Sequence, residues 1–577
     1  MKNLEIAKIF NEMADFIEMK EISFKSRAYR RVSRFLNSLE QDIEDVYYKG
    51  GVKELKKFPG IGEAIAGNIE EFIRTDKIKV YQRLKKECPV DLGELKKIEG
   101  LGARKIKILY EKLKIKNLKN LEKAAKAGKI GELDGFGEKS EKNILQSIEI
   151  AKSDKGRFLL GRILPIVRKI IDELKELPEV NKISIAGSVR RMKETVGDVD
   201  ILIVSSKSEK IMDYFVQMKG VIKVWAKGKT KSSVRFRIGF DCDLRVVKKD
   251  SFGAALQYFT GSKEHNIMTR RIAIKNKLKL NEYGVYNKDK QIAGKNEKEV
   301  YKSIGLQYIE PELRTNTGEI EASLRQAQGE LNQLPKLIKY NDIKGETHCH
   351  SDWSDGSATI ENLAKIAKEI GYEYLVITDH ASPLGIIHGL NEERILKQIE
   401  EIDRVNQKVS GITILKGVEV DIKADGSLFI EDKVLSQLDF VLGAIHSGFK
   451  MDKKTATERL IKAMKNPHID AIAHPSGRVI QKREGYQLDF PEILKVAKKT
   501  KTALEINAHE KRLDLRDIHI RQAVEVGVKM TIGTDVHNVN YFKMMELGIA
   551  QARRGWAERK DILNSSSLDN FLKYFKK

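Results

Sequence analysis

The chain has 577 residues, with 106 Lys and Arg against 83 Asp and Glu, a formal net charge of +23. This length predicts several domains, and the excess positive charge favours a polyanionic partner, nucleic acid ahead of an anionic membrane. No apolar run approaches the roughly 20 residues that span a bilayer, and the amphipathic start predicts a helix, not a signal peptide. The only cysteines, Cys88, Cys242 and Cys349, are far apart, which excludes a disulfide framework or zinc ribbon and fits a reducing, cytoplasmic compartment.

Residues 1–150 are predicted to form short, Lys-rich helices, because apolar residues recur there at spacings of three and four. Three glycine pairs interrupt this region at intervals of 40 and 35 residues, and a new helix is expected after each pair. The pairs resemble helix-hairpin-helix motifs, in which glycine lets the backbone approach a DNA phosphate and the next helix offers unpaired N–H groups. The alternative is that each pair only caps a helix. We expect sequence-independent DNA contacts at Gly60, Gly62, Gly100, Gly102, Gly135, Gly137 and Lys25.

Residues 151–305 change to a mixture of helix and strand, with β-branched runs. Asp198 and Asp200 stand two apart at the start of an apolar strand, so their carboxylates share one face. Such a pair, completed by a carboxylate from a neighbouring strand, can hold divalent cations for in-line phosphoryl displacement. Asp243 and Asp241 both follow an alternating strand, and their spacing alone does not choose between them.

Five motifs in this region are similar to those of the X family of DNA polymerases, to which polymerase beta belongs. They are G-S-V-R-R, G-D-V-D, C-D-L-R, Y-F-T-G-S-K-E-H-N and N-E-Y-G-V-Y, and the resemblance covers roughly residues 1–305. It implies a polymerase beta-like nucleotidyltransferase palm in which Asp198, Asp200 and Asp243 bind Mg²⁺ or Mn²⁺. The nucleotide-binding residues that it implies are Ser188, Arg191, Gly197, Tyr258, Phe259, Gly261, Asn266 and Arg270.

Residues 306–342 are polar and contain Pro311 and Pro335, which predicts a linker or an irregular covering segment. In residues 343–577, apolar runs alternate with amphipathic helices, as in a parallel β/α barrel. Ten of the eleven histidines lie after residue 340, and several follow apolar runs. Because barrel active sites lie at the C-terminal ends of the strands, these side chains should converge. Nine imidazole and carboxylate groups would suffice for two or three Zn²⁺, Mn²⁺ or Fe²⁺ ions.

The histidine pattern is similar to that of the PHP family, the polymerase and histidinol phosphatase phosphoesterases, over about residues 343–560. The resemblance implies a distorted barrel of PHP type with the metal ligands His348, His350, Asp355, His380, Glu419, His446, His474, Asp535 and His537. We expect structural roles for His468 and His519, and the roles of His388 and His509 stay open. Arg478, in H-P-S-G-R, is a candidate for holding phosphate.

Together the two regions resemble bacterial and archaeal X-family polymerases with a C-terminal PHP domain. The implied function is DNA-directed synthesis that fills short gaps in base excision or end repair, with a metal-dependent 3′–5′ exonuclease or abasic-site endonuclease in the PHP domain. The expected partners are gapped or nicked DNA and deoxynucleoside triphosphates, with no membrane, and a monomer is expected. The alternative is a DNA-binding scaffold with a phosphatase for small monoesters, which would not need the complete aspartate set.

The first glycine turn departs from the X-family pattern. Lyase-active members carry a lysine on the following helix, and its amine forms a Schiff base with the abasic sugar. Aligning F-P-G-I-G-E-A-I-A-G-N-I with that motif puts Asn68 at the lysine position. Because an amide cannot form the imine, little or no 5′-deoxyribose-phosphate lyase activity is expected.

Overall fold

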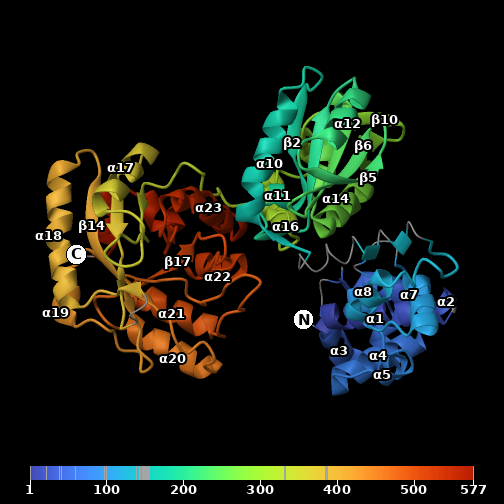
Figure 1. Cartoon of the computed structure of the whole chain (residues 1–577), viewed down its shortest axis with the longest axis horizontal. Coiled ribbons are helices and arrows are strands. Elements are labelled where there is room, and N and C mark those ends of the chain that lie inside the picture. Colours follow the sequence, from blue (N-terminus) through green and yellow to red (C-terminus); the bar gives the residue numbers. More distant parts are fainter. Residues whose placement is uncertain are drawn as a thin grey trace. The chain divides into compact units, whose positions relative to one another are not determined.

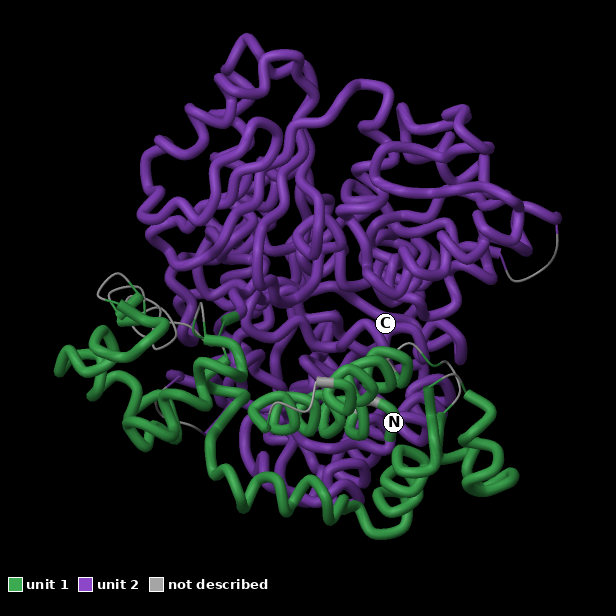
Figure 2. Tube along the Cα trace, turned by 90° about the vertical axis from the view of Figure 1, so that its right-hand side faces the viewer, with its two compact units in different colours: residues 1–156 green, residues 157–577 purple. Residues whose placement is uncertain are grey.

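The computed structural model divides the chain into two compact units, residues 1–156 and 157–577 (Figure 2). It describes all residues except 1, 21–22, 38, 40–41, 59, 97, 99–100, 138–139, 142–143, 146–155, 330–332, 384–386 and 576–577. Gly100, which is predicted to contact DNA, therefore lies outside the described residues. In the part of the chain that is described, no helix is both long and apolar enough to cross a membrane.

The first unit is helical, and its core is built from the apolar faces of its helices. Ile6, Phe10 and Met13 of the first helix are fully buried, as their spacing of four and three residues predicts. Gly62 and Gly102 stand directly before α4 and α7 in extended conformations, without a side-chain cap. The helices are α1 (Lys2–Met19), α2 (Ser23–Asn37), α3 (Ile43–Leu55), α4 (Glu63–Thr75), α5 (Lys79–Glu87), α6 (Leu92–Leu95), α7 (Ala103–Leu113) and α8 (Leu118–Lys126) (Figure 1).

The second unit begins with a five-stranded sheet in the order β2-β4-β7-β6-β5. Strands β4 and β7 are parallel, and their register pairs Asp198 with Asp241 and Asp200 with Asp243. Alternating burial along β7 places Cys242 in the core and the two aspartates on the opposite face. The elements are β1 (Phe158–Leu159), α10 (Leu160–Lys175), β2 (Lys182–Ile185), α11 (Gly187–Arg190), β3 (Thr195–Val196), β4 (Asp198–Val204), α12 (Ser208–Gln217), β5 (Val221–Lys227), β6 (Lys231–Phe236), β7 (Asp241–Val247), α13 (Phe252–Thr260) and α14 (Lys263–Lys275).

The first part of the predicted linker is packed against a small sheet, in the order β10-β9-β8. Leu313 and Ile320 are buried in the apolar cluster that includes this sheet. The fully buried guanidinium of Arg314 forms an ion pair with Glu297 at 2.6 Å, which fixes the segment in place. The elements are β8 (Lys279–Asn281), β9 (Gly284–Asn287), β10 (Lys290–Ala293), α15 (Glu297–Ser303), η2 (Pro311–Leu313) and α16 (Glu319–Gln328).

The C-terminal part is a parallel barrel-like sheet surrounded by helices, as the sequence predicts (Figure 1). The strand order is β11-β12-β14-β15-β16-β17-β18, and β13 pairs with β14. A parallel bridge between Cys349 and Val536, beyond the ends of β11 and β18, brings the two edges of the sheet together. The strands are β11 (Gly345–Glu346), β12 (Tyr374–Ile377), β13 (His380–Ala381), β14 (Thr413–Asp421), β15 (Phe440–Ala444), β16 (Ala471–Ile472), β17 (Ala503–Asn507) and β18 (Met530–Gly533). The helices are α17 (Ile360–Ile370), α18 (Glu392–Lys408), α19 (Asp432–Leu435), α20 (Lys453–Met464), α21 (Phe490–Thr500), α22 (Asp517–Val526), α23 (Met545–Arg554) and α24 (Leu568–Phe575).

Candidate active sites

The first candidate site lies at the start of β4 and β7, where four aspartates share one face of the sheet. Asp241 accepts hydrogen bonds from Arg235 at 2.7 and 2.8 Å and from Trp225 Nε1 at 2.7 Å. Asp243 is paired with Asp200 across the two strands. It accepts a hydrogen bond from the Ser233 hydroxyl at 2.6 Å and forms an ion pair with Lys231 at 2.9 Å. Asp243 pairs with Asp200 across the two strands and its charge acts on Asp200, whereas Asp241 is held by the Arg235 fork, so the geometry favours Asp243 as the third carboxylate of the set.

Asp200 is half-buried among like charges. Burial, followed by the charges of Asp198 and Asp243, raises its pKa to about 7. Gly187 has a φ of +62°, and a Cβ atom there would overlap Asp200 Oδ2, so glycine is required where the loop approaches this carboxylate. A divalent cation among the three carboxylates would offset their mutual repulsion, so the donor set suits Mg²⁺ or Mn²⁺.

Beside these aspartates is a cavity of about 620 Å³. Its lining includes Arg157, Lys193 and Lys263 as well as residues predicted from the sequence. The cavity brings together Asp198 and Asp200 with all the predicted nucleotide-binding residues, Ser188, Arg191, Gly197, Tyr258, Phe259, Gly261, Asn266 and Arg270. Asn266 donates to the Tyr258 carbonyl at 2.6 Å and accepts from Gln257 at 2.8 Å, so it also holds the floor of this cavity together.

The second candidate site lies at the C-terminal ends of the barrel strands. Three groups of side chains have potential ligand atoms within 4.8 Å of one another, and they share His350 and His380. The groups are His350, Asp355, His380 and His537; His348, His350 and Asp535; and His380, Glu419 and His446. His474 Nε2 lies 3.0 Å from Glu419 Oε1, so the nine predicted ligands form one connected cluster.

Several buried ligand atoms in this cluster have no hydrogen-bond partner, although buried polar atoms are normally satisfied. They include both ring nitrogens of His350, the Nε2 atom of His348 and the Nδ1 atom of His474. Burial, with His537 and His380 nearby, lowers the pKa of His350 well below its usual value, so the ring is neutral and has a lone pair to donate. Imidazoles mixed with carboxylates suit Zn²⁺, Mn²⁺ or Fe²⁺.

Two carboxylates that the sequence analysis missed orient the histidines. Glu505, on β17, contacts His348 Nδ1 at 2.5 Å, and Asp421, at the end of β14, contacts His446 Nδ1 at 2.6 Å. A carboxylate only accepts, so each holds its imidazole with Nδ1 protonated and leaves Nε2 for a metal. The signal in the sequence is an acidic residue within an apolar strand, A-L-E-I-N for Glu505.

The remaining histidines lie outside the three ligand groups. His509 Nδ1 accepts from the backbone of Lys511 at 3.2 Å, and the ring meets Tyr541 edge-on. His519 stacks on Phe490 at 3.6 Å between ring centroids, a packing role in line with expectation. Arg478, expected to hold phosphate in the barrel, instead forms an ion pair at 2.6 Å with Glu194 of the aspartate-bearing region.

Two of the glycines predicted to contact DNA, Gly60 and Gly135, lie in turns. Gly60 has a φ of +90°, and the guanidinium of Arg31 lies against it. Gly135 and Gly137 also have positive φ, a conformation that favours glycine. Lys25 is exposed, whereas Asn68 is buried and donates a hydrogen bond to Tyr29 Oη at 2.8 Å.

Models of known protein families match successive parts of the chain. A DNA polymerase beta palm matches residues 162–277 and a DNA polymerase beta thumb matches residues 255–315. A PHP domain matches residues 346–509. A helix-hairpin-helix domain matches residues 1–78, and a SAM-like helix-hairpin-helix tandem matches residues 92–149. The fold and sites therefore define a beta-type nucleotidyltransferase joined to helix-hairpin-helix repeats and a PHP domain.

Similarity to a single relative extends over the whole chain. The DNA polymerase/3′-5′ exonuclease PolX of Bacillus subtilis is 37% identical over 585 residues, and the alignment covers 100% of both chains. A probable phosphatase of Thermoanaerobacter sp. (strain X514) is 31% identical over 205 residues, 33% of this chain and 78% of its own. The chain belongs to the PolX family of DNA polymerases with a PHP domain.

Proposed function

We propose that this protein is a DNA-directed DNA polymerase that fills short gaps during repair, including base excision repair, and that its PHP domain is a 3′–5′ exonuclease. One observation carries the polymerase function: a single cavity gathers Asp198, Asp200 and the predicted nucleotide-binding residues. The full-length relative from Bacillus subtilis is named for both activities. The alternative, a scaffold with a monoester phosphatase, draws on relatives that match only a third of the chain and leaves this cavity without a role.

In the palm, Asp198, Asp200 and Asp243 would hold Mg²⁺ or Mn²⁺. Bound there, such ions would supply activation of the primer 3′-hydroxyl and stabilisation of the charge on the transferred phosphoryl group. The chain's own residues position the nucleotide: Ser188 and Arg191 face the same cavity and can bind triphosphate oxygens. Gly261, with a φ of +70°, allows the sugar to approach the backbone beside Tyr258 and Phe259.

In the PHP domain, the nine-residue cluster would hold two or three Zn²⁺, Mn²⁺ or Fe²⁺ ions, which supply an activated water for phosphodiester hydrolysis. Glu505 and Asp421 would fix the orientation of His348 and His446. The same chemistry would serve abasic-site cleavage as a further activity of this domain. The helix-hairpin-helix turns and Lys25 would bind the phosphates of gapped or nicked DNA without reading sequence.

The test is incubation of the purified chain with end-labelled gapped and recessed DNA, with and without deoxynucleotides, in Mg²⁺ and then Mn²⁺. Extension of the primer with nucleotides and its shortening without them is the expected result. The alternative function predicts neither product and predicts release of phosphate from small monoesters. That pattern would overturn the proposal.

A further inference from the structure

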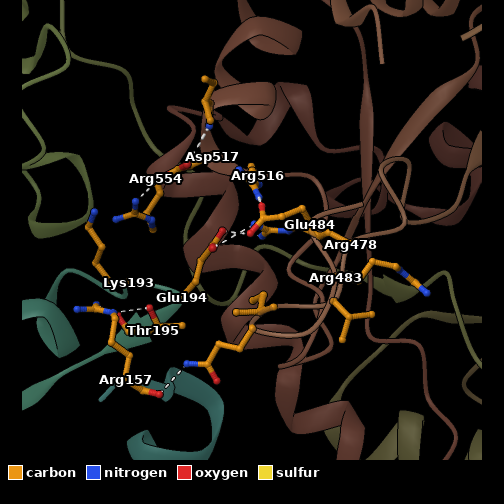
Figure 3. A pocket seen from close by; sticks show the side chains of 14 residues that line it. Arg157, Lys193, Glu194, Thr195, Arg478, Arg483, Glu484, Arg516, Asp517 and Arg554 are labelled. Carbon is orange, nitrogen blue, oxygen red and sulfur yellow. Dashed lines mark hydrogen bonds and ion pairs between the residues drawn. The ribbon is translucent and has the colours of Figure 1, made fainter. Parts of the chain in front are cut away.

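A second cavity, of about 560 Å³, lies within the second unit where the palm meets the PHP domain (Figure 3). The palm contributes Arg157 and the segment 193–195. The PHP domain contributes the loop 478–484 and residues 516–518 at the start of α22, and Arg554 at the end of α23 completes the lining. The cavity is distinct from the metal cluster, because none of the nine predicted ligands is among its lining residues.

The lining is strongly cationic, with six Lys or Arg side chains against three carboxylates. Each carboxylate already has an arginine partner: Glu194 pairs with Arg478 at 2.6 Å, Glu484 with Arg516 at 2.8 Å, and Asp517 with Arg554. Arg157, Lys193 and Arg483 have no carboxylate partner in the described part of the chain. The net positive charge therefore has no counterpart within the cavity wall, and an anion would supply one.

Two of the arginines in this lining are deeply buried. Arg478 and Arg554 are 3% and 8% exposed. Because water screens a buried charge less than an exposed one, their attraction for an anion in the cavity is stronger than that of surface arginines. Burial, and next the charge of Arg554, lower the pKa of Lys193, so its ammonium also gains if an anion arrives.

The cavity adjoins the phosphate side of the nucleotide site. Arg157 and Lys193 line both cavities. Arg554, from the PHP domain, donates from Nη1 to the backbone carbonyl of Arg191 at 3.3 Å. A ligand here would thus lie next to the predicted triphosphate contacts, although most of the cavity wall belongs to residues outside that site.

We propose that this palm–PHP cavity is a second anion site that binds a small polyphosphate, with inorganic pyrophosphate as its ligand. The excess of cationic side chains in the lining carries the phosphate chemistry. The choice of pyrophosphate rests on the proposed polymerase function, because nucleotidyl transfer releases it in the adjoining cavity. Pyrophosphate held here would contact both domains and would favour their association.

Isothermal titration of the full-length protein with pyrophosphate, in EDTA so that no divalent ion contributes, tests the site. Lys193→Met should weaken binding about tenfold, since it removes one charge-assisted contact. Glu194→Gln keeps the shape of the side chain and removes a negative charge, so binding should tighten several-fold. Tighter binding is a result that general damage to the fold does not produce.

Two variants serve as controls. Arg270→Gln alters only the nucleotide cavity and should leave this affinity unchanged, and Lys482→Gln removes an exposed charge from the same loop without touching the lining. If Arg270→Gln abolished binding while Lys193→Met and Glu194→Gln had no effect, the anion would occupy the nucleotide site and the proposal would be wrong.

A parallel titration with a 5′-phosphorylated single-stranded oligonucleotide separates the two sources of phosphate. Binding of the oligonucleotide without binding of pyrophosphate would make the cavity a DNA contact and would overturn the polyphosphate proposal. Primer extension is measured separately on the wild-type protein. Its absence, together with the expected pyrophosphate pattern, would refute the polymerase function and leave the anion site intact.

Discussion

Replacing Asp200 with asparagine should stabilise the metal-free palm although it destroys the polymerase site. Burial and the charges of Asp198 and Asp243 raise the pKa of Asp200 from 3.8 to about 7. A carboxyl whose pKa is raised in the folded state does not lower the free energy of unfolding at pH values below its unfolded-state pKa. As the pH rises above that value, the loss of stability grows until the carboxyl also ionises in the folded state. The penalty is about 4 kcal/mol at pH 8 and about 1 kcal/mol at pH 4.5, as an upper limit for this coupled set.

Urea denaturation of the full-length protein in EDTA, at pH 4.5 and pH 8, measures this effect. The gain from Asp200→Asn should be large at pH 8 and small at pH 4.5. Asp241→Asn is the matched control on the same face, and it should destabilise the protein because it removes the charge that pairs with Arg235 and the oxygen that accepts from Arg235 Nη2. If Asp200→Asn destabilised the protein at pH 8, or if its gain did not depend on pH, the electrostatic account of this site would be refuted.

Three further predictions concern activity. Asp200→Ala should abolish primer extension and spare 3′–5′ degradation. His350→Ala should reduce degradation at least about a hundredfold and spare extension. Loss of both activities in either variant, if the variant is folded, would contradict the prediction that the two activities have separate sites. Deleting residues 1–156 should weaken binding to gapped DNA and flatten the plot of log K against log salt, and an unchanged slope would place the main phosphate contacts elsewhere. Borohydride should not cross-link residues 1–156 to an incised abasic substrate, because Asn68 has no amine and its amide donates a hydrogen bond to Tyr29. Efficient trapping would show that another side chain acts as the nucleophile.

The sequence by itself predicted the kinds of sites and proposed the residues that form them. Asp198 and Asp200 alternate on one strand, and the barrel ligands follow apolar runs in order, so local periodicity was enough to group them. The helical first unit follows from the same kind of local spacing. The family resemblance then supplied the roles, and the matched palm, thumb and PHP models confirm the predicted fold.

Only the tertiary structure decided features that depend on contacts between distant segments. Spacing could not separate Asp243 from Asp241, and the resemblance alone preferred Asp243; the fold adds that Asp243 pairs with Asp200 across β4 and β7, while Arg235 and Trp225 hold Asp241. Glu505 is 157 residues from His348 in sequence, so its orienting contact has no local signature. The cavity around Lys193 likewise exists because two domains fold against each other, and charge patterns along a chain do not encode which surfaces meet.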